Sequence, residues 1–357
     1  MAALTPDTLA SLTTLRVGGA ARELFSPLTR AELVTTALEV WATGEDWFAL
    51  GGGSNVVVAD SGFDGSVIRI LTRGIERLPS LVDGRVTLRV QAGEPWDDLV
   101  AFTVSEGLAG LEALSGIPGS CGAAPVQNIG AYGTELSASL TAIDFLDYES
   151  GEVHVLLANE LGLGYRTSVI KRGRGGIVLS LNVELTDATG QSAPVAYEQL
   201  AGALSVPLGS RLPLAEVRAS VMALRRSKGM VLDVSDADSV SVGSFFTNPI
   251  VSEKFARFLP WDAPRFAVEP GAGPGLGSDS VKLSAAWLIE RAGIRRGFAL
   301  PGSRAAVSGK HSLALTNRGG ATASEIYQLA RFIQERVRNE FGVTLSPEPM
   351  YLGVDLG

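Results

Sequence analysis

The sequence predicts an α+β fold, because strand patterns fill most of its first half and helical patterns lie between and after them. Val86, Leu88 and Val90 alternate with polar residues, which is the pattern of a half-buried strand. Residues 322–341 carry apolar side chains three and four positions apart, which is the spacing of one helix face. Because 357 residues exceed what one hydrophobic core serves, two or three domains are expected.

The first half contains two predicted helices, over residues 31–43 and 95–105, the second beginning at Pro95 and burying Trp96, Leu99, Val100 and Val104. Residues 140–158 are predicted to form two strands joined by a turn at 149–152. Further predicted strands share short runs of apolar, often β-branched residues: 47–50, 56–58, 67–70, 86–91 and 177–185. The glycines between the first two of these predict a tight turn.

The second half is predicted to be more helical. Val217, Val221 and Leu224 are in helical register, and Lys282 to Ala292 is predicted to form another helix. Thr322 and Glu325 match a capping box that opens a helix ended by Gly342, and residues 343–352 follow as an extended segment. The glycine-rich stretch from Glu269 to Ser280 is predicted to be an exposed, mobile loop.

Composition excludes several classes of function. The net charge of -8 and the pI near 5.0 argue against nucleic acid or an anionic membrane as a partner. Neither a membrane span nor a signal peptide is visible, so a cytoplasmic protein is expected. Cys121 is the only cysteine, and His154 and His311 are the only histidines, so disulfides and Cys- or multi-His metal sites within the chain are excluded.

Gly51-Gly52-Gly53-Ser54-Asn55 stands between two apolar segments and is one candidate ligand cradle. Consecutive backbone N–H groups of such a turn can surround a phosphate, with the Ser and Asn side chains as further donors. No Gly-Lys-Ser/Thr follows, so the run is not a P-loop, and no helix is expected after it, as a Rossmann fingerprint requires. A glycine-rich hairpin turn without a ligand is the alternative.

The second candidate cradle is the small-residue stretch from Gly116 to Gly133. It is too apolar for a solvated loop and too rich in Gly, Ala and Pro for a helix or strand. Small side chains let the backbone approach a flat polar ligand, and the amides Gln127 and Asn128 match the donors and acceptors at the edge of a flavin ring. A buried packing loop is the alternative. Cys121 is expected to be a small buried hydrophobe, not a nucleophile.

These motifs, in this order, resemble UDP-N-acetylenolpyruvoylglucosamine reductase, the MurB family. The resemblance runs from about Thr14 to Gly353 and is carried by the following segments: Gly51 to Asn55, Ile117-Pro-Gly119, Gln127 to Gly133, Tyr165-Arg166, Gly243 to Phe246, Asn248-Pro249 and Pro347-Glu348. It implies a two-part FAD-binding region of the vanillyl-alcohol-oxidase type and a separate α+β substrate domain. The implied boundaries are 1–72, 73–203 completed by 341–357, and 204–340.

The resemblance implies reduction of UDP-N-acetylglucosamine-enolpyruvate to UDP-N-acetylmuramate with NADPH, in peptidoglycan precursor synthesis. In the matching positions Arg166 binds the substrate carboxylate and Ser244 donates a proton to the neighbouring carbon. A planar guanidinium can hold a carboxylate bidentately and stabilise the enediolate form. Glu348 either donates a proton to that carboxylate or only orients its neighbours. Without the resemblance, Arg166 would be interpreted as a surface residue and Ser244 as part of a turn or helix cap. Glu348 would be interpreted as a solvated acid in a C-terminal strand.

The resemblance further implies noncovalent FAD. Its contacts are expected from the two cradles and one strand residue: Gly51, Gly52, Gly53, Ser54, Asn55, Ser115, Ile117, Pro118, Gly119, Gly122, Ala123, Ala124, Gln127, Asn128, Gly130, Ala131, Tyr132 and Val178. Substrate contacts are expected from Tyr165, Tyr197, Lys228, Asn248 and His311. Tyr197 marks the type I branch of the family, and the spacer from Lys228 to Ser244 is longer than in its best-known members. Structural roles for Tyr197 and His311 are the alternatives.

Two other functions are compatible with the fold. An FAD oxidase would not need Ser244, Arg166 and Glu348 together and would be reduced without NADPH. The second alternative function is that of a regulator that binds nucleotide sugars or flavin and catalyses no reaction. Apart from the substrate and NADPH, the sequence predicts no nucleic-acid or membrane partner, and a monomer is expected.

Overall fold

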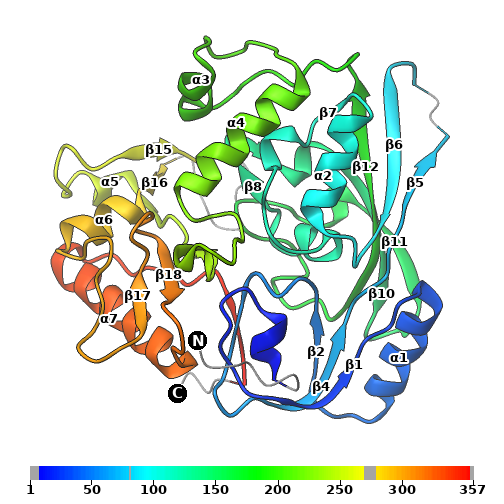
Figure 1. The fold of residues 1–357 in the computed structure, drawn as a ribbon, viewed down its shortest axis with the longest axis horizontal. Coiled ribbons are helices and arrows are strands. Elements are labelled where there is room, and N and C mark those ends of the chain that lie inside the picture. Colours follow the sequence, from blue (N-terminus) through cyan, green and yellow to red (C-terminus); the bar gives the residue numbers. More distant parts are fainter. Residues whose placement is uncertain (1–7, 80–81, 269–278, 354–357) are drawn as a thin grey trace. The chain divides into compact units, whose positions relative to one another are not determined.

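The computed structural model describes residues 8–79, 82–268 and 279–353. Its contacts divide the chain into two compact units, each built from separate stretches of sequence (Figure 1). Unit 1 comprises residues 1–21, 53–64 and 228–357, and unit 2 comprises residues 22–52 and 65–227. The loop predicted from Glu269 to Ser280 lies almost entirely outside the described residues. The three-part division expected from the family resemblance stays a prediction.

In the described part of unit 2, the largest sheet has six strands, in the order β11-β10-β12-β6-β5 with β7 beside β12. Their bounds are β5 (Ile75–Leu78), β6 (Arg85–Gln91), β7 (Leu108–Ala109), β10 (Leu140–Asp147), β11 (Val153–Leu157) and β12 (Gly176–Asp187). Neighbouring strands are antiparallel. The alternation predicted from the sequence is confirmed, because Val86, Leu88 and Val90 are buried and the residues between them are more exposed.

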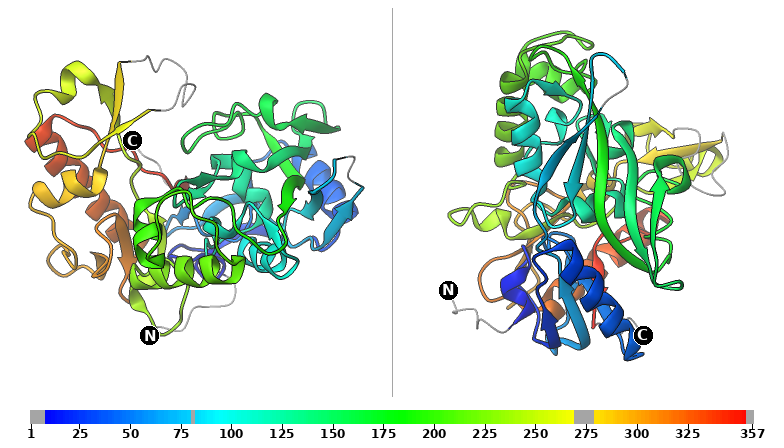
Figure 2. Two further views of the ribbon diagram at one scale, coloured as in Figure 1. Left: turned by 90° about the horizontal axis from the view of Figure 1, so that it is seen from above. Right: turned by 90° about the vertical axis from the view of Figure 1, so that its right-hand side faces the viewer.

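Helices cover one face of this sheet. Both Figure 1 and Figure 2 show α2 (Trp96–Ser105) and α4 (Leu214–Ser227) on the same side of it, and α3 (Glu198–Leu204) packs against α4. The predicted start of α2 is confirmed, with Pro95 as its N-cap residue. Thr103 completes the buried face of α2 where Val104 was expected.

A smaller sheet has the order β1-β4-β2, formed by β1 (Ala21–Phe25), β4 (Phe63–Arg69) and β2 (Trp47–Leu50). The helix α1 (Arg30–Ala42) packs its buried residues into the same core, and a capping box at Thr29 opens it.

The prediction of a strand, tight turn and strand around the glycine run needs one correction. β2 pairs in parallel with β4, and β3 (Val56–Val58) pairs in parallel with β19 (Met350–Leu352), so no hairpin forms. All three valines of β3 are buried, and near-continuous burial is typical of parallel strands.

Unit 1 contains two three-stranded sheets among its described residues, with the orders β13-β18-β17 and β14-β16-β15. Their strands are β13 (Ser241–Ser244), β14 (Ile250–Ser252), β15 (Arg265–Ala267), β16 (Ser280–Leu283), β17 (Ala305–Val307) and β18 (Ala314–Asn317). The helices are α5 (Glu253–Ala256), α6 (Ala285–Arg291) and α7 (Ala323–Phe341). A shared hydrophobic core lies between α6, α7 and strands of both sheets.

The two helices predicted in this unit differ in outcome. The predicted opening and end of α7 are confirmed, with a capping box of Thr322 and Glu325 and with Gly342 in the left-handed region at φ 68°. The helix predicted from Lys282 is shorter than expected, because Lys282 belongs to β16. The hydroxyl of Ser284 accepts a hydrogen bond from the Trp287 N–H, which sets the start of α6.

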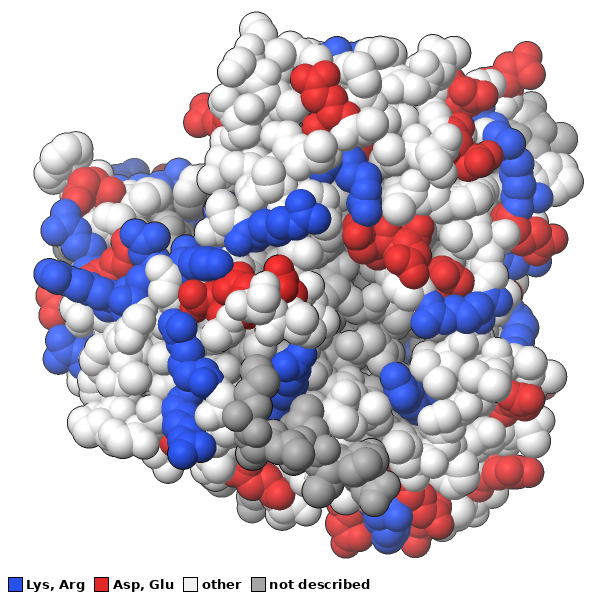
Figure 3. Space-filling view, viewed as in Figure 1, with Lys and Arg blue, Asp and Glu red and all other residues white. Residues whose placement is uncertain are grey.

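None of the helices that the structure describes is both long and apolar enough to cross a bilayer. On the face drawn in Figure 3, acidic and basic side chains are interspersed.

Candidate active site

The two small-residue loops predicted as cradles meet in unit 2. A Cβ atom added to Gly51 would lie 2.3 Å from the hydroxyl oxygen of Ser120, and one added to Gly52 would lie 2.6 Å from the Cα atom of Gly119. Both separations are shorter than real Cβ contacts. At Gly52 the opposing atoms belong to the backbone, so glycine is required there, whereas at Gly51 the Ser120 hydroxyl could turn aside. The loops therefore pack backbone against backbone, and one ligand could contact both.

The first turn of α2 holds the second cradle in place. The Trp96 N–H donates to the carbonyl of Gly119 at 3.0 Å, and the Trp96 indole N–H donates to the carbonyl of Leu114 at 3.0 Å. Residues Cys121–Gln127, expected to be irregular, form a 3-10 helix after these contacts. Cys121 is fully buried, and burial raises the pKa of its thiol well above the ordinary value. It is therefore not a reactive thiolate.

Asp97, also in this turn, connects the cradle to α4. Its carboxylate accepts the Gly116 N–H at 2.6 Å and forms a two-pronged ion pair with Arg218 at 2.7 and 2.8 Å. Burial raises the pKa of Asp97, but the hydrogen bonds from Arg218 and Gly116 outweigh it, so that the pKa lies below its ordinary value. Asp97 was not predicted as a site residue, although an acid in the first turn of a helix is a recognisable anchor.

Arg166 is held against the far end of the same cradle. Its backbone is left-handed at φ 53°, and its guanidinium donates to the carbonyls of Asn128 and Gly130 at 3.3 and 2.7 Å. The ring of Tyr165 lies beneath that guanidinium, with 5.7 Å between the ring centroid and Cζ. Unit 2 thus brings Tyr165, Arg166 and Gly130 together.

The predicted amides of the cradle have protein partners. The Asn128 side chain donates to Glu135 and to the carbonyl of Gly164, and its oxygen accepts the Ser137 N–H. The Gln127 oxygen accepts from Lys171 at 3.2 Å. These bonds fix the shape of the loop, so its backbone is the part best suited to meet a ligand.

Tyr132 and Tyr197 also lie together, ring edge to ring face, with centroids 5.9 Å apart. Tyr197 is the N-cap residue of α3 and is 45% exposed. Arg225 of α4 is an electrostatic neighbour of Tyr132, Asp97 and Arg166, and burial lowers the pKa of its guanidinium. The sequence offered a signal for Arg225, because it lies seven residues after Arg218 and so on the same helical face.

Unit 1 brings Ser244, Glu348 and Asn55 onto neighbouring backbone segments. Gly243, at φ 75°, accompanies a register shift in the pairing of β13 with β18, and Ser244 follows it in a partly exposed position. The N–H of Glu348 donates to the carbonyl of Phe245 at 2.9 Å. The Asn55 side chain donates to the carbonyl of Glu348 at 3.4 Å.

The remaining substrate candidates also lie in unit 1. Lys228 follows the end of α4. The Asn248 side-chain oxygen accepts the N–H of Ala285 at 2.9 Å and so holds the start of α6. His311 lies in the loop between β17 and β18, where its Nδ1 atom accepts the Leu313 N–H at 3.2 Å.

The other predicted cofactor residues differ in burial. Gly53, Ser115, Gly122, Ala124 and Val178 are buried, and Val178 of β12 belongs to a hydrophobic core. The more exposed ones belong to the two loops: Ser54, Ile117, Pro118, Ala123 and Ala131. Among the described residues, no group of three or more His, Cys, Asp or Glu side chains is arranged to hold a metal ion.

Comparison with known proteins places two family models on the chain. Residues 21–157 match an FAD binding domain, and residues 235–352 match the C-terminal domain of UDP-N-acetylenolpyruvoylglucosamine reductase. The fold is therefore a two-part flavin-binding region of this type with a separate second domain.

Similar proteins match along nearly the whole chain. A UDP-N-acetylenolpyruvoylglucosamine reductase of Leifsonia xyli is 58% identical over 376 residues, covering 98% of this chain and 99% of that protein. One of Saccharopolyspora erythraea is 49% identical, covering 96% and 93%. The crystal structure of the enzyme from Thermus caldophilus is similar with a TM-score of 0.63 and 27% identity, covering 97% of both chains.

Proposed function

Given that the chain belongs to the UDP-N-acetylenolpyruvoylglucosamine reductase family, we propose that it reduces UDP-N-acetylglucosamine-enolpyruvate to UDP-N-acetylmuramate with NADPH. Family membership makes it an oxidoreductase with an FAD-binding domain. The proposal adds the hydride donor, the substrate and the residues that act on it.

The cradle of unit 2 fits a flavin nucleotide. Gly51 and Gly52 lie against Ser120 and Gly119, so one ligand could reach both loops. Because these glycines carry no side chains, a ligand could approach their backbone closely. Main-chain amides of such turns bind phosphate and the polar edge of a ring. When bound, FAD supplies the hydride carrier between NADPH and the substrate alkene.

The observation that carries the proposed reaction is the hydrogen bond between Glu348 and Phe245, because it sets Glu348 beside the strand that presents Ser244. Hydride addition to the terminal alkene carbon leaves charge on the adjacent carbon and its carboxylate. Ser244 would donate its hydroxyl proton to that adjacent carbon. The enediolate is a strong base, which is why a hydroxyl can serve as the acid.

Arg166 would bind the carboxylate while this charge develops. Its guanidinium is held by two carbonyl oxygens of the loop, so it is oriented before the substrate arrives. Glu348 would donate a proton to the same carboxylate or orient it. Tyr197 and Lys228 would bind the sugar and diphosphate, Asn248 would act beside them, and His311 would bind near the uridine.

The experiment that tests this function separates the two half-reactions. We expect Ser244→Ala to be reduced by NADPH like the unsubstituted protein, because Ser244 has no role in that step. Reoxidation by the enolpyruvyl substrate should slow by roughly 10²–10⁴-fold, as is typical when an acid–base residue is removed. Stopped-flow absorbance of the flavin under argon measures both rates.

The matched control is Ser346→Ala, which removes an exposed hydroxyl from the same unit. It should leave both rates unchanged. Normal reoxidation of Ser244→Ala by the substrate would overturn the assigned acid. A purified protein without a flavin spectrum, or one that NADPH does not bleach, would overturn the proposed reductase and favour a binding protein or an oxidase.

A further inference from the structure

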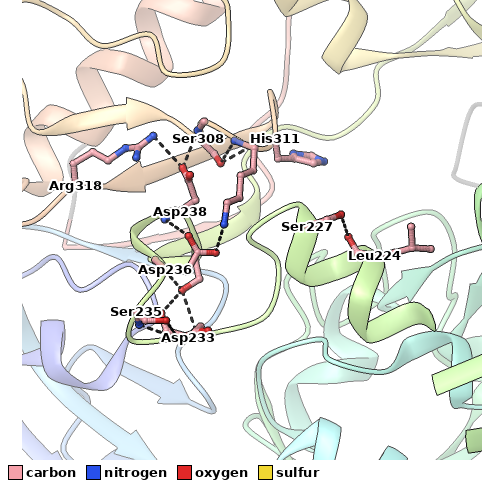
Figure 4. A network of polar contacts seen from close by, with 12 residues as sticks. Leu224, Ser227, Asp233, Ser235, Asp236, Asp238, Ser308, His311 and Arg318 are labelled. Atoms are coloured by element: carbon pink, nitrogen blue, oxygen red, sulfur yellow. Dashed lines mark hydrogen bonds and ion pairs between the residues drawn. The ribbon is translucent and has the colours of Figure 1, made fainter. Parts of the chain in front are cut away.

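The spacer between Lys228 and Ser244 is the sequence feature to which the proposed function gives no role. Within unit 1 it folds into an acidic hook, residues 233–239. Asp233 accepts the N–H and hydroxyl of Ser235 at 2.8 and 2.7 Å, and Asp236 accepts the Asp238 N–H at 3.1 Å. These local bonds give the hook a defined shape and aim Asp238 away from it (Figure 4).

Asp238 connects the hook to the loop that bears His311. The Asp238 side chain is nearly buried, and its Oδ1 atom accepts the Gly309 N–H at 2.8 Å and pairs with Arg318 at 3.0 Å. Asp236 adds a second ion pair, to Lys310 at 2.8 Å. In Figure 4, Asp238 lies between Asp236 of the hook and the residues Ser308 and Arg318, and a dashed line joins it to Arg318.

The conformation of the loop that bears His311 is fixed by its own hydrogen bonds. The Ser308 hydroxyl accepts the N–H groups of Lys310 and His311 at 3.0 and 3.2 Å. Because Nδ1 of His311 accepts the Leu313 N–H, the neutral imidazole carries its proton on Nε2. The Leu313 carbonyl in turn accepts the Phe245 N–H at 2.7 Å, next to Ser244. His311 and the Ser244 strand thus share one hydrogen-bonded frame.

We propose that Asp238 is a positioning residue for the nucleotide end of the substrate, acting through His311. Its carboxylate accepts the Gly309 N–H, two residues before His311, and pairs with Arg318, which follows β18. The segment that bears His311 is thus anchored on both sides, and His311 is held in place before the uracil ring of the substrate arrives. This inference rests on the proposed function, because that function assigns His311 to the uridine. On this proposal, the longer spacer between Lys228 and Ser244 contributes to recognition of the uridine and has no role in the hydride or proton transfer.

Binding of UDP to the FAD-loaded protein, measured by titration calorimetry, tests the proposal. Asp238→Asn keeps an acceptor for the Gly309 N–H but removes the charge that pairs with Arg318. We expect its Kd for UDP to rise roughly tenfold, and KM for the enolpyruvyl substrate to rise with kcat nearly unchanged. The control Asp262→Asn breaks the exposed ion pair with Arg291 in the same unit and should leave the Kd unchanged.

A double-mutant cycle with His311→Ala distinguishes positioning from general stability. If Asp238 acts through His311, Asp238→Asn should weaken UDP binding much less in the His311→Ala background. Equal weakening in both backgrounds, or a lower melting temperature with an unchanged Kd for UDP, would overturn the proposal. Should Asp238→Asn fail to fold, Arg318→Gln disrupts the same pair from the other side and is read by the same criteria.

UDP binding by the unsubstituted protein distinguishes a failure of the proposed function from a failure of the inference on Asp238. If it does not bind UDP at all, the proposed function fails and this inference fails with it. If it binds UDP and Asp238→Asn binds equally well, only the inference on Asp238 is wrong.

Discussion

The two loops that bear predicted site residues are held in place by opposite means. The cradle of unit 2 depends on missing side chains, because Gly51 and Gly52 rest directly on Gly119 and Ser120. The loop of His311 in unit 1 depends on carboxylates of the acidic hook, because Asp236 pairs with Lys310 and Asp238 accepts the Gly309 N–H. The two loops should therefore be sensitive to different substitutions. The cradle should not tolerate added volume, whereas the His311 loop should respond to changes of charge.

The strongest test of this comparison is a single methyl group in the cradle. Gly52→Ala places a Cβ atom 2.6 Å from the Cα atom of Gly119, and backbone cannot move aside as a flexible side chain does. We expect FAD affinity to fall by at least about tenfold, in line with the cost of overpacking. The ratio of flavin to protein absorbance after gel filtration measures the loss.

Gly202→Ala is the matched control, since no atom lies within 4 Å of an added Cβ atom there. In the helix α3 this change should leave FAD content intact and stabilise the protein slightly. Full flavin content in Gly52→Ala would show that the cradle does not contact the cofactor.

A smaller effect is expected where the cradle does use a charge. Asp97→Asn weakens the bonds to Gly116 and Arg218, and we expect the free energy of unfolding at pH 7 to fall by about 1.5–3 kcal/mol. Denaturant titration followed by tryptophan fluorescence measures it. Asp98→Asn, which removes an exposed carboxylate from the same helical turn, is the control and should change little.

The pH dependence of this difference follows from the lowered pKa of Asp97. A carboxyl whose pKa is lower in the folded state stabilises the fold fully above its ordinary value of 3.8. That contribution is lost as the pH falls through the lowered folded value. The stability difference between the unsubstituted protein and Asp97→Asn should therefore shrink in strong acid. A difference that stays constant with pH would contradict the assigned ion pair.

The smallest effect is expected from Lys310, which is part of the loop that bears His311. Hydrogen bonding to Asp236 raises the pKa of Lys310, but exposed ion pairs contribute little. Lys310→Met should therefore change the Kd for UDP by less than about threefold, well below the effect of Asp238→Asn. A calorimetric titration with UDP compares the two variants. An effect of Lys310→Met as large as that of Asp238→Asn would place the anchor of the loop at Asp236 instead.

Local patterns account for the parts of the fold that were predicted well. The capping box at Thr322, the alternation around Leu88 and the start of α2 at Pro95 each depend on residues a few positions apart. The start of α6 was placed too early, because the run from Lys282 is apolar enough for a strand or a helix. Its pairing with β14 and β15, which decides for the strand, is not visible in the run itself.

The family of the protein can be recognised from the chain alone, because its small-residue runs and ordered motifs are local in sequence. Which of those motifs meet could be known only from the folded protein. Gly51 rests on Ser120, Asp97 is clamped by Arg218, and Asp238 reaches Gly309. Such contacts join residues far apart in the chain, and their energy exists only once the backbone has closed the loops between them.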